Sequence, residues 1–372
     1  MLFRSFGTAK WHINEIHNEL RQNFPEFEGL ELTKLPETLD LISARTEFYD
    51  FPTALPQVER SSIKLDLHRR DFTINTLALR LDGNHYGELY DYWGGYEDLL
   101  SGQIKVLHSL SFVDDPTRLI RAIRFEQRFN FKIEDRTFQL LLEAKDLLNQ
   151  VSGDRLRHEI NLILAEPNPK PALIRLEELD LLKQIHPNLH INTAIAEKII
   201  RVQKSSIEPI WQLPGLNGTI KQSILLAYLT WFMYLDKNPR PICKRLRTPA
   251  IITDSSIKAQ KAMKSIPKYR NKKPSEITEY FDTLSQHILF IVYATTDDEG
   301  IKDIIYKYIT HWMKVKPFTN GEDLRKMGIP PGPTYKKILS RLRKAWLDQE
   351  ILNIDHEHIL LDEVISSINE NE

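Results

Sequence analysis

The stretch that decides the fold reads Asp114-Asp115-Pro116-Thr117-Arg118-Leu119-Ile120-Arg121. Asp115 before proline predicts a helix N-cap carboxylate, with proline at the first helical position. Arg118 follows one turn later, so the acceptor and the guanidinium are expected to be neighbours on the helix surface. Short apolar runs separated by turn residues precede this stretch, and apolar residues at helical spacing follow it. The sequence therefore predicts an α+β protein in which a sheet region precedes helices.

The apolar pattern also places the individual elements. Strands of a partial mixed sheet are predicted at residues 39–42, 77–81, 88–91 and 104–107. Helices are predicted at residues 119–129, 138–148, 156–164, 301–315 and 335–346. In the first strand Asp40 alternates with Leu39 and Leu41, so its carboxylate is expected on the face opposite the leucines.

The pair Asp115 and Arg118 has the chemistry to read a nucleobase. Cytosine and adenine present an exocyclic amino donor beside a ring nitrogen acceptor, whereas uracil and guanine present a carbonyl beside a ring N–H. A carboxylate next to a guanidinium therefore matches C and A and leaves buried polar groups unpaired against U and G. The alternative is that Asp115 does no more than cap the helix.

A second charged segment, residues 66–75, precedes the first by about forty residues and contains Arg70, Asp71 and Asn75. Together the two segments resemble the class II tRNA nucleotidyltransferases and bacterial poly(A) polymerases. Further stretches match in the family's order and spacing: residues 40–47, 69–75, 91–99 with Gly94-Gly95, 114–121 followed by Arg124-Phe125, 153–157, and 319–324 leading to 328–333. The resemblance covers the chain from about Phe3 onwards.

The resemblance implies an enzyme that adds C and A, or part of that triplet, to tRNA 3' ends from CTP and ATP. A poly(A) polymerase of the same family is the alternative. It implies a truncated nucleotidyltransferase head followed by an all-helical neck, body and tail. The expected boundaries are 1–108 for the head remnant, 109–165 for the neck with the base-reading helix, 166–274 for the helical body with a basic segment, and 275–372 for the tRNA-contacting tail.

The resemblance also implies roles for the charged residues of the two segments. Arg70 and Asp71 would hold the ribose and triphosphate, with Asn75 nearby. The alternative for Arg70 and Asp71 is a buried ion pair with no ligand. Arg121 and Arg124 lie in a narrow arc of the base-reading helix, where they would line the triphosphate or RNA path or form a solvated arginine face.

One part of the family pattern is expected to be missing. The family places a Gly-Gly-x-Val-Arg-Asp turn and an Asp-x-Asp pair, which holds two Mg²⁺ ions, ahead of the region that begins here at Phe3. The chain contains no Asp-x-Asp, and Asp40 is the carboxylate expected to remain as the catalytic and metal-binding group of a partial site. The pair would come from a separate polypeptide, from an upstream coding region, or not at all. The last case would leave a non-catalytic tRNA-binding module or a decayed enzyme fragment.

Composition bounds the class of protein. The chain has 372 residues, of which 41% are hydrophobic and 27% charged, enough for more than one core. The lone Cys243 excludes a disulfide framework within the chain and a cysteine-rich zinc site. Neither a secretory leader nor a spanning apolar run is evident, so a cytoplasmic protein without a membrane partner is expected.

Positive charge concentrates in residues 240–273, which hold eleven Lys or Arg residues and one acid, a local charge of +10. Such a segment is expected to bind RNA phosphates, and the candidates are Lys244, Arg245, Arg247, Lys258, Lys261 and Lys264. A solvated linker is the alternative. The prolines in this segment predict short helices and loops.

A second candidate RNA contact lies near the end of the chain. The loop 328–333 precedes a helix predicted to begin near Thr334, which carries Lys336 and Lys337. Free N–H groups at a helix start attract phosphate. The alternative is a plain turn between two helices.

Overall fold

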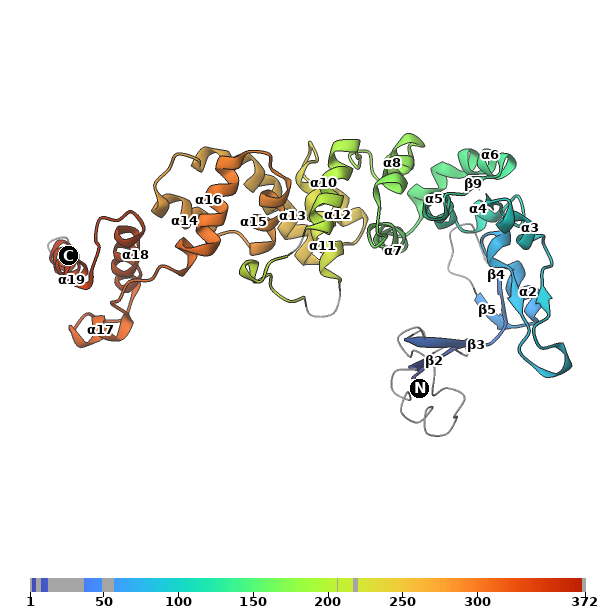
Figure 1. Ribbon diagram of the computed structural model, residues 1–372, viewed down its shortest axis with the longest axis horizontal. Coiled ribbons are helices and arrows are strands. Elements are labelled where there is room, and N and C mark those ends of the chain that lie inside the picture. Colours follow the sequence, from blue (N-terminus) through green and yellow to red (C-terminus); the bar gives the residue numbers. More distant parts are fainter. Residues whose placement is uncertain are drawn as a thin grey trace. The chain divides into compact units, whose positions relative to one another are not determined.

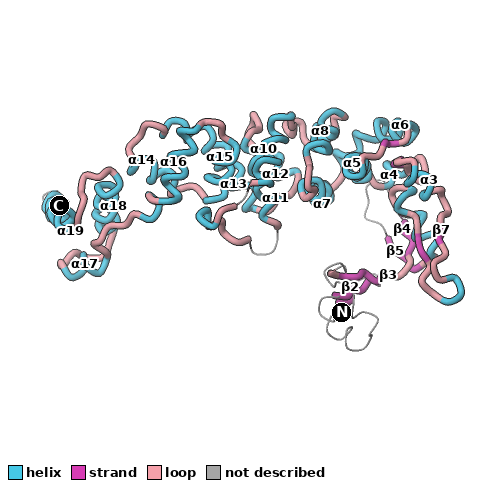
Figure 2. The backbone as a smooth tube through the Cα atoms, viewed as in Figure 1, coloured by secondary structure: helices cyan, strands magenta, loops and turns pink. Residues whose placement is uncertain are grey.

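The computed structural model describes residues 2–4, 8–12, 37–48, 57–205, 207–216 and 220–369. The chain divides into two compact units, Met1–Val151 and Ser152–Glu372. Within the described residues every strand belongs to the first unit, and the second unit is helical (Figure 2). The predicted α+β class is confirmed.

The first unit carries several small sheets. Three antiparallel strands, in the order β1-β2-β3, are Leu2–Arg4, Thr8–His12 and Thr38–Ile42. The other described strands form three pairs: β4 (Arg45–Phe48) with β5 (Gln57–Arg60), β6 (Ala78–Leu79) with β7 (Leu89–Tyr90), and β8 (Gln103–Ile104) with β9 (Lys132–Ile133). The first two pairs are antiparallel, and β8 and β9 are parallel. β9 corrects the expectation of helices alone beyond Pro116.

The helices of the first unit surround a core to which α5 contributes most. They are α2 (Ile63–His68), α3 (Gly95–Leu100), α4 (Ser111–Asp114), α5 (Thr117–Phe129) and α6 (Asp135–Ala144), with short 3₁₀ turns η4 (Thr73–Asn75), η5 (Gly83–His85) and η6 (Lys145–Gln150) (Figure 1). Leu119, Ile120 and Ile123 of α5 are fully buried because residues three and four positions apart lie on the same side of a helix. Phe72 and Ile104 are also fully buried in this unit.

The second unit contains a succession of helices. They are α7 (Gly153–Leu164), α8 (Lys170–Glu178), α9 (Leu181–Ile185), α10 (Thr193–Lys204), η7 (Pro209–Trp211), α11 (Gln222–Met233), α12 (Arg240–Arg245), α13 (Ala250–Ser265), η8 (Ile266–Tyr269), α14 (Pro274–Phe281), α15 (Gln286–Thr295), α16 (Glu299–Thr310), η9 (Trp312–Lys314), α17 (Gly321–Lys326), α18 (Pro333–Leu347) and α19 (Ile354–Asn369) (Figure 1). Residues 224–233 of α11 are all buried because this helix is apolar on every side.

For this unit the expectation about the basic segment is corrected, and the expectation of two helices near the end of the chain is confirmed. The basic segment was expected to form short helices and loops, but α13 is a continuous helix of 16 residues. Pro249 lies just before its first turn, where proline does not interrupt helical hydrogen bonding. The two predicted helices near the end of the chain are confirmed as α16 and α18. No helix in the described residues combines the length and apolar character needed to cross a membrane.

Candidate functional site

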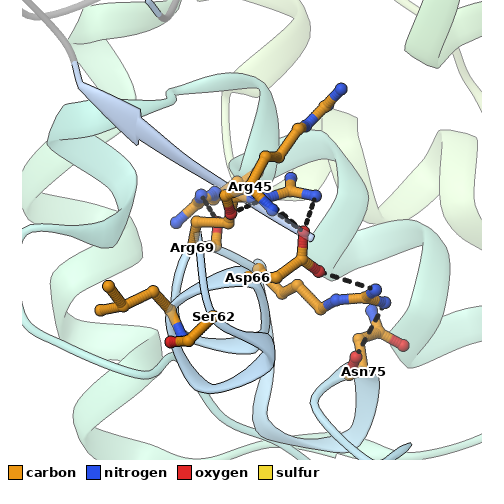
Figure 3. Close-up of polar contacts among 8 residues, drawn as sticks. Arg45, Ser62, Asp66, Arg69 and Asn75 are labelled. Atoms are coloured by element: carbon orange, nitrogen blue, oxygen red, sulfur yellow. Dashed lines mark hydrogen bonds and ion pairs between the residues drawn. The ribbon is translucent and has the colours of Figure 1, made fainter. Parts of the chain in front are cut away.

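The first cluster of charged residues is centred on Asp66, which is 5% exposed. Its Oδ1 accepts hydrogen bonds from the backbone N–H of Arg45 at 3.1 Å and from Nη2 of Arg69 at 2.9 Å (Figure 3). Its Oδ2 accepts from Nη2 of Arg70 at 3.3 Å, and Nη1 of Arg70 donates to the carbonyl of Asn75 at 3.2 Å. One helical turn brings Asp66 beside the two arginines that follow it.

The second cluster is centred on Asp71, which is 6% exposed. Its Oδ1 accepts from the amide of Asn75 at 2.8 Å and from the backbone N–H of Phe72 at 3.0 Å. Its Oδ2 accepts from Nε of Arg121 at 2.8 Å and from Nη2 at 2.5 Å. The ion pair considered for Arg70 and Asp71 is therefore not formed: Arg70 pairs with Asp66, and Asp71 pairs with Arg121 on α5.

Both carboxylates are held in the ionised form. Burial raises the pKa of Asp66, but hydrogen bonds from Arg69 and from the Arg45 N–H outweigh it, so the pKa lies below its usual value. Burial also raises the pKa of Asp71, and the charge of Arg121 with the hydrogen bond from Asn75 again lowers it further than burial raises it. The two clusters are thus fixed ion-pair networks at neutral pH.

Gly94-Gly95 supports the loop that carries Asn75. A Cβ on Gly95 would lie 2.2 Å from the backbone oxygen of Thr73, so only glycine fits at this contact. The carboxylate of Asp91 accepts from the N–H groups of Gly95 at 2.8 Å and Tyr96 at 3.0 Å and so fixes the start of α3. Gly94 has a φ of 71°, in the left-handed region that favours glycine. This element therefore holds the 3₁₀ turn η4 in place.

The positions of Asp115 and Arg118 differ in part from those expected. Asp115 lies just before α5, and its Oδ1 accepts from the backbone N–H of Thr117 at 2.9 Å and from its hydroxyl at 2.6 Å. It therefore caps α5, which begins one residue later than expected. Arg118 is 6% exposed instead of lying on the helix surface, and it donates to Oγ of Ser111 at 2.7 Å and to the carbonyl of Arg69 at 2.8 Å.

These two bonds fix the plane of the Arg118 guanidinium while using two of its five N–H groups. The bond to the Arg69 carbonyl also ties α5 to the Asp66 cluster. The structure thus brings Arg70, Asp71, Asn75 and Arg121 into one hydrogen-bonded network, with Arg118 joined to it through Arg69.

The arginines of α5 differ in how far they are exposed to solvent. Arg124 is 6% exposed and lies over the ring of Phe125 at 4.8 Å from its centroid. Arg121 is partly exposed, lies 5.5 Å from the same centroid and binds Asp71. Arg128 is exposed. The alternative of a uniformly solvated arginine face is therefore wrong for Arg124.

Asp40 lies on β3 as predicted, with its side chain 58% exposed. It faces Lys10 across the β2–β3 pair, and Nζ of Lys10 is 3.7 Å from Oδ1. Among the described residues no three His, Cys, Asp or Glu side chains gather in a way that could hold a metal ion. The described residues alone therefore do not fit the two-metal site that the family resemblance implies.

Part of the basic segment is used to join helices within the second unit. Arg247 binds Oδ2 of Asp154 at 2.9 Å, and Arg157 binds Oδ1 at 2.8 Å. Arg157 also donates to the carbonyls of Leu246 and Arg247. A Cβ on Gly153 would lie 2.1 Å from the carbonyl oxygen of Arg245, so the start of α7 is packed against this loop. The predicted contribution of Arg247 to RNA binding competes with this internal role.

The lysines of the segment are arranged differently. Lys244 is exposed at the end of α12. Lys258, Lys261 and Lys264 are exposed along α13, and none of the three forms an ion pair among the residues that the structure describes. Their spacing of three residues keeps them on neighbouring positions of one helix face. This lysine row on α13 has the exposure and charge that a phosphate backbone requires.

Near the end of the chain, α18 begins at Pro333, with Gly332 as its N-cap. Lys336 and Lys337 are both exposed in its first turns. Lys336 lines a cavity between α14 and α18, whereas Lys337 is not among its lining residues. The structure therefore separates two neighbouring lysines that the sequence treated alike.

Sequence reasoning missed the hub role of Asp66 and the partners Ser111 and Asp154. A signal for the first was present, because Asp66 precedes Arg69 and Arg70 by three and four residues, the spacing of helical ion pairs. The bond from Arg118 to Ser111 joins α5 to the start of α4, and no residue pattern indicated it.

Two family models match the chain. The model described as "Poly A polymerase head domain" covers residues 8–105, and the one described as "Probable RNA and SrmB- binding site of polymerase A" covers residues 130–192. The first covers the Asp66 and Asp71 carboxylates, and the helical region follows it. The fold and the matched head define the nucleotidyltransferase class.

Individual relatives agree with this assignment. The chain is 35% identical to the A-adding tRNA nucleotidyltransferase of Geobacter sulfurreducens, and the match covers 88% of this chain and 38% of the relative. It is 31% identical to the A-adding tRNA nucleotidyltransferase of Halalkalibacterium halodurans, and that match covers 81% of this chain and 68% of the relative. The Thermotoga maritima CCA-adding enzyme, solved in complex with tRNA, is 28% identical with a TM-score of 0.63 over 92% of this chain and 84% of that one. The chain belongs to the class II tRNA nucleotidyltransferase and poly(A) polymerase family. It spans little more than a third of the Geobacter relative's length.

Proposed function

We propose that this chain acts in adding nucleotides from CTP or ATP to tRNA 3' ends in the cytoplasm. The observation that carries the proposal is the anchored guanidinium of Arg118, joined through the Arg69 carbonyl to the Asp66 network and close in sequence to the Asp71–Arg121 pair. Base selection requires donors that do not move when the wrong nucleotide arrives. A buried arginine with two protein acceptors meets that requirement.

Within this proposal each polar group has a separate task. The remaining N–H groups of Arg118 donate to the ring nitrogen of cytosine or adenine, and Asp115 accepts from the exocyclic amino group. Arg70, whose side chain is 42% exposed, and Arg121 supply positive charge for the triphosphate. Asp71 positions Arg121 and Asn75, since both of its oxygens already accept hydrogen bonds from the protein. Arg124, buried over Phe125, supports α5 from within.

The RNA would bind through the second unit. Lys258, Lys261 and Lys264 offer a row of cations without ion partners among the described residues, and Lys244 adds a fourth exposed charge. Arg245 and Arg247 contribute less, because the end of α12 and the loop that follows it are fastened to α7. Attraction to phosphates through such lysines is long-range, depends on salt and does not select a sequence.

The metal requires groups beyond those described. Family members are expected to use Mg²⁺ held by paired carboxylates, and Asp40 would be one ligand of such a site. Asp40 is exposed and next to Lys10, so on its own it does not hold a divalent ion. We infer that the other carboxylates are supplied by a head segment from a separate polypeptide.

Among the possible products, addition of A is favoured because two of the three relatives reported above are A-adding enzymes and the third is a CCA-adding enzyme. A poly(A) polymerase is the second candidate, and the names of the two matching family models favour it. A tRNA-binding module without catalysis is the third, and the exposed, unclustered Asp40 favours that one.

A tRNA end-extension assay with each nucleotide separates these candidates. The chain is assayed alone and after addition of a head segment that carries the family's Asp-x-Asp pair. We expect extension with ATP or CTP, limited to one or a few residues, when that segment is present. Long A tails would favour the poly(A) polymerase. Tight tRNA binding with no extension under either condition would favour the binding module.

The role of Arg118 is tested by Arg118→Ala in the same assay. Loss of the fixed donors should reduce the preference for ATP or CTP over GTP and UTP by about 10-fold or more, the range for a buried hydrogen-bonded contact. Arg128→Ala, which removes an exposed arginine from the same helix, serves as the matched control. Unchanged nucleotide preference in Arg118→Ala would count against base reading by this residue.

A further inference from the structure

A groove of about 510 Å³ lies in the second unit between the ends of α17 and the first half of α19. Its apolar lining consists of Phe318, Met327, Ile354 and Leu361. The first three are 62%, 49% and 44% exposed, so three large apolar side chains meet solvent around one groove. Single apolar residues on a surface are ordinary, whereas several around one groove indicate an interaction site.

The groove is built on a packed core. Leu361 is 3% exposed and belongs to a cluster with Leu324 of α17 and with Ile338 and Leu342 of α18, all of which are fully buried. The three helices are therefore held together beneath the groove by side chains that solvent does not reach. A binding surface supported in this way keeps its shape before a partner arrives.

The most exposed apolar side chain of the groove is anchored through its backbone. The N–H of Phe318 donates to Oε2 of Glu357 at 3.0 Å, and the N–H of Thr319 donates to Oε1 at 2.6 Å. Glu357 is fully buried on α19, and Nε1 of Trp346 also donates to it. The exposed Phe318 ring is thus attached to a fixed segment. An aromatic side chain held in place before binding loses little entropy when a partner covers it.

The rim of the groove is acidic. Asp323 and Asp362 line it, and Asp362 is exposed and forms no ion pair among the described residues. Asp323 has Lys326 at 4.0 Å. Residues 345–372 contain eight Asp or Glu and no Lys or Arg, a local charge of −8. A surface of this charge repels a phosphate backbone and attracts the cations of a peptide.

We propose that this groove binds a basic peptide segment of another protein. The peptide places a bulky apolar side chain against Phe318, Met327 and Ile354, and its Lys or Arg residues lie beside the acidic rim. The apolar contact supplies most of the affinity, and the charges speed association and exclude nucleic acid. The groove and the lysine row on α13 thus differ in charge and in the class of partner that they attract.

Binding is tested by fluorescence anisotropy with the full chain and a labelled helical peptide as long as α19, with Leu on one face and Lys on the other. Its controls are a peptide of the same composition in scrambled order and a peptide with Glu in place of each Lys. We expect the first peptide to bind at least about 10-fold more tightly than either control. Equal binding of the basic and acidic peptides, or no binding of the first, would overturn the proposal.

The position of the peptide is tested by Phe318→Ala, with Tyr306→Ala as the matched control. Tyr306 is also an exposed aromatic residue, on α16, and does not line the groove. Phe318→Ala should weaken peptide binding by about 10-fold or more, as expected for an aromatic side chain at the centre of an interface. Met327→Ala gives a second, independent measurement and should also weaken binding. Parent-like affinity in both groove variants would place the peptide elsewhere and overturn the site.

The charge of the rim is tested by Asp362→Asn over a series of salt concentrations. The variant should weaken binding of the basic peptide by about 2- to 5-fold at low salt, and the difference should shrink as salt screens the charges. Glu208→Gln removes an exposed acid elsewhere in the second unit and should have a smaller effect. Equal losses in the two variants would mean that net charge, not the rim, attracts the peptide.

Two further measurements distinguish this partner from other occupants of the groove. Affinity for a tRNA transcript should be the same in Phe318→Ala as in the parent, because the acidic rim disfavours RNA. Loss of tRNA binding in that variant would assign the groove to RNA and overturn the peptide. Sedimentation over a range of protein concentrations tests a second copy of this chain. Self-association of the parent that Phe318→Ala removes would assign the groove to that copy and likewise overturn the proposal.

Discussion

The arginines around Asp66 and Asp71 and the lysines on α13 show two ways of using positive charge. In the first unit Arg69, Arg70 and Arg121 each bind a buried carboxylate. In the second unit Lys258 and Lys261 are exposed and have no ion partner among the described residues. The planar guanidinium can be fixed by several hydrogen bonds, whereas the ammonium group of lysine stays mobile on its flexible stem.

The difference corresponds to what each region would recognise. A nucleotide has a defined shape, so charges that bind it must be held in place before it arrives. An RNA backbone presents many similar phosphates, and mobile cations on a helix face adapt to them at little energetic cost. Breaking contacts in the first region should therefore affect folding and selectivity, whereas removing the lysines should affect affinity and its dependence on salt.

The largest expected effect comes from the two tightly packed glycines, one in each unit. A Cβ at position 95 would meet the Thr73 carbonyl oxygen at 2.2 Å, and one at position 153 would meet the Arg245 carbonyl oxygen at 2.1 Å. Because backbone must shift in each case, Gly95→Ala and Gly153→Ala should each lower the free energy of unfolding by about 3–5 kcal/mol. Gly215→Ala, which meets no atom within 4 Å, is the control. Urea unfolding in which all three variants matched the parent would contradict these contacts.

The next largest effect is expected for Asp71→Ala, which leaves Arg121 without its carboxylate. Removing one partner of a buried ion pair is costly, and the partial exposure of Arg121 reduces that cost to roughly 2–4 kcal/mol. Asp82→Ala removes an exposed carboxylate that binds Arg80, and it should change stability much less. Similar midpoints for the two variants in urea would show that the Asp71 pair does not fix α5.

Acid should lower the stability of the region around Asp66 and Asp71 more than that of the lysine row on α13. The pKa values of Asp66 and Asp71 lie below those of the unfolded chain, so their contribution to stability is present at neutral pH. It is lost as the pH falls below about 4 and through the folded-state values. In Asp71→Asn this part of the acid dependence should disappear. Parallel stability curves for Asp71→Asn and the parent from pH 7 to pH 3 would contradict the assignment.

The contrast between the regions was only partly predictable. Asp115, Pro116 and the apolar positions of α5 follow local rules of capping and periodicity, so the helix and its capping carboxylate could be inferred from sequence. The exchange of partners by Arg70 and Asp71 could not, since the Asp71–Arg121 pair joins residues 50 positions apart and depends on packing. The family pattern pointed to residues that the structure joins in one hydrogen-bonded network, and the structure shows which carboxylate each arginine binds.

The basic segment illustrates the same limit. Charge counting identified it, but could not separate Arg247, which binds Asp154 across 93 positions, from the exposed lysines of α13. Nor could it recognise α13 as one helix, because the prolines of the segment suggested interruptions while Pro249 lies just before the first turn. Partner choice between distant helices is set by tertiary contacts that local patterns do not encode.

The smallest effect on stability is expected from replacing Lys258, Lys261 and Lys264 together by Gln. Exposed charges without partners contribute little to folding, so the free energy of unfolding should change by less than about 0.5 kcal/mol. The affinity for tRNA should nevertheless fall, and the salt slope should decrease by about 2–3. Replacement of the exposed Lys183, Lys204 and Lys221 by Gln is a charge-matched control outside α13. Equal losses for the two triple variants would mean that net charge, not the lysine row, binds the RNA.

The division between selective and electrostatic recognition is tested most directly by measuring tRNA and ATP binding in parallel, across a salt series, for the parent, Arg118→Ala and the Lys258/Lys261/Lys264→Gln variant. We predict that Arg118→Ala weakens ATP binding with little change in the salt slope for tRNA. The lysine variant should reduce that slope with little change in ATP binding. Loss of both activities in both variants, with each still folded, would contradict the account.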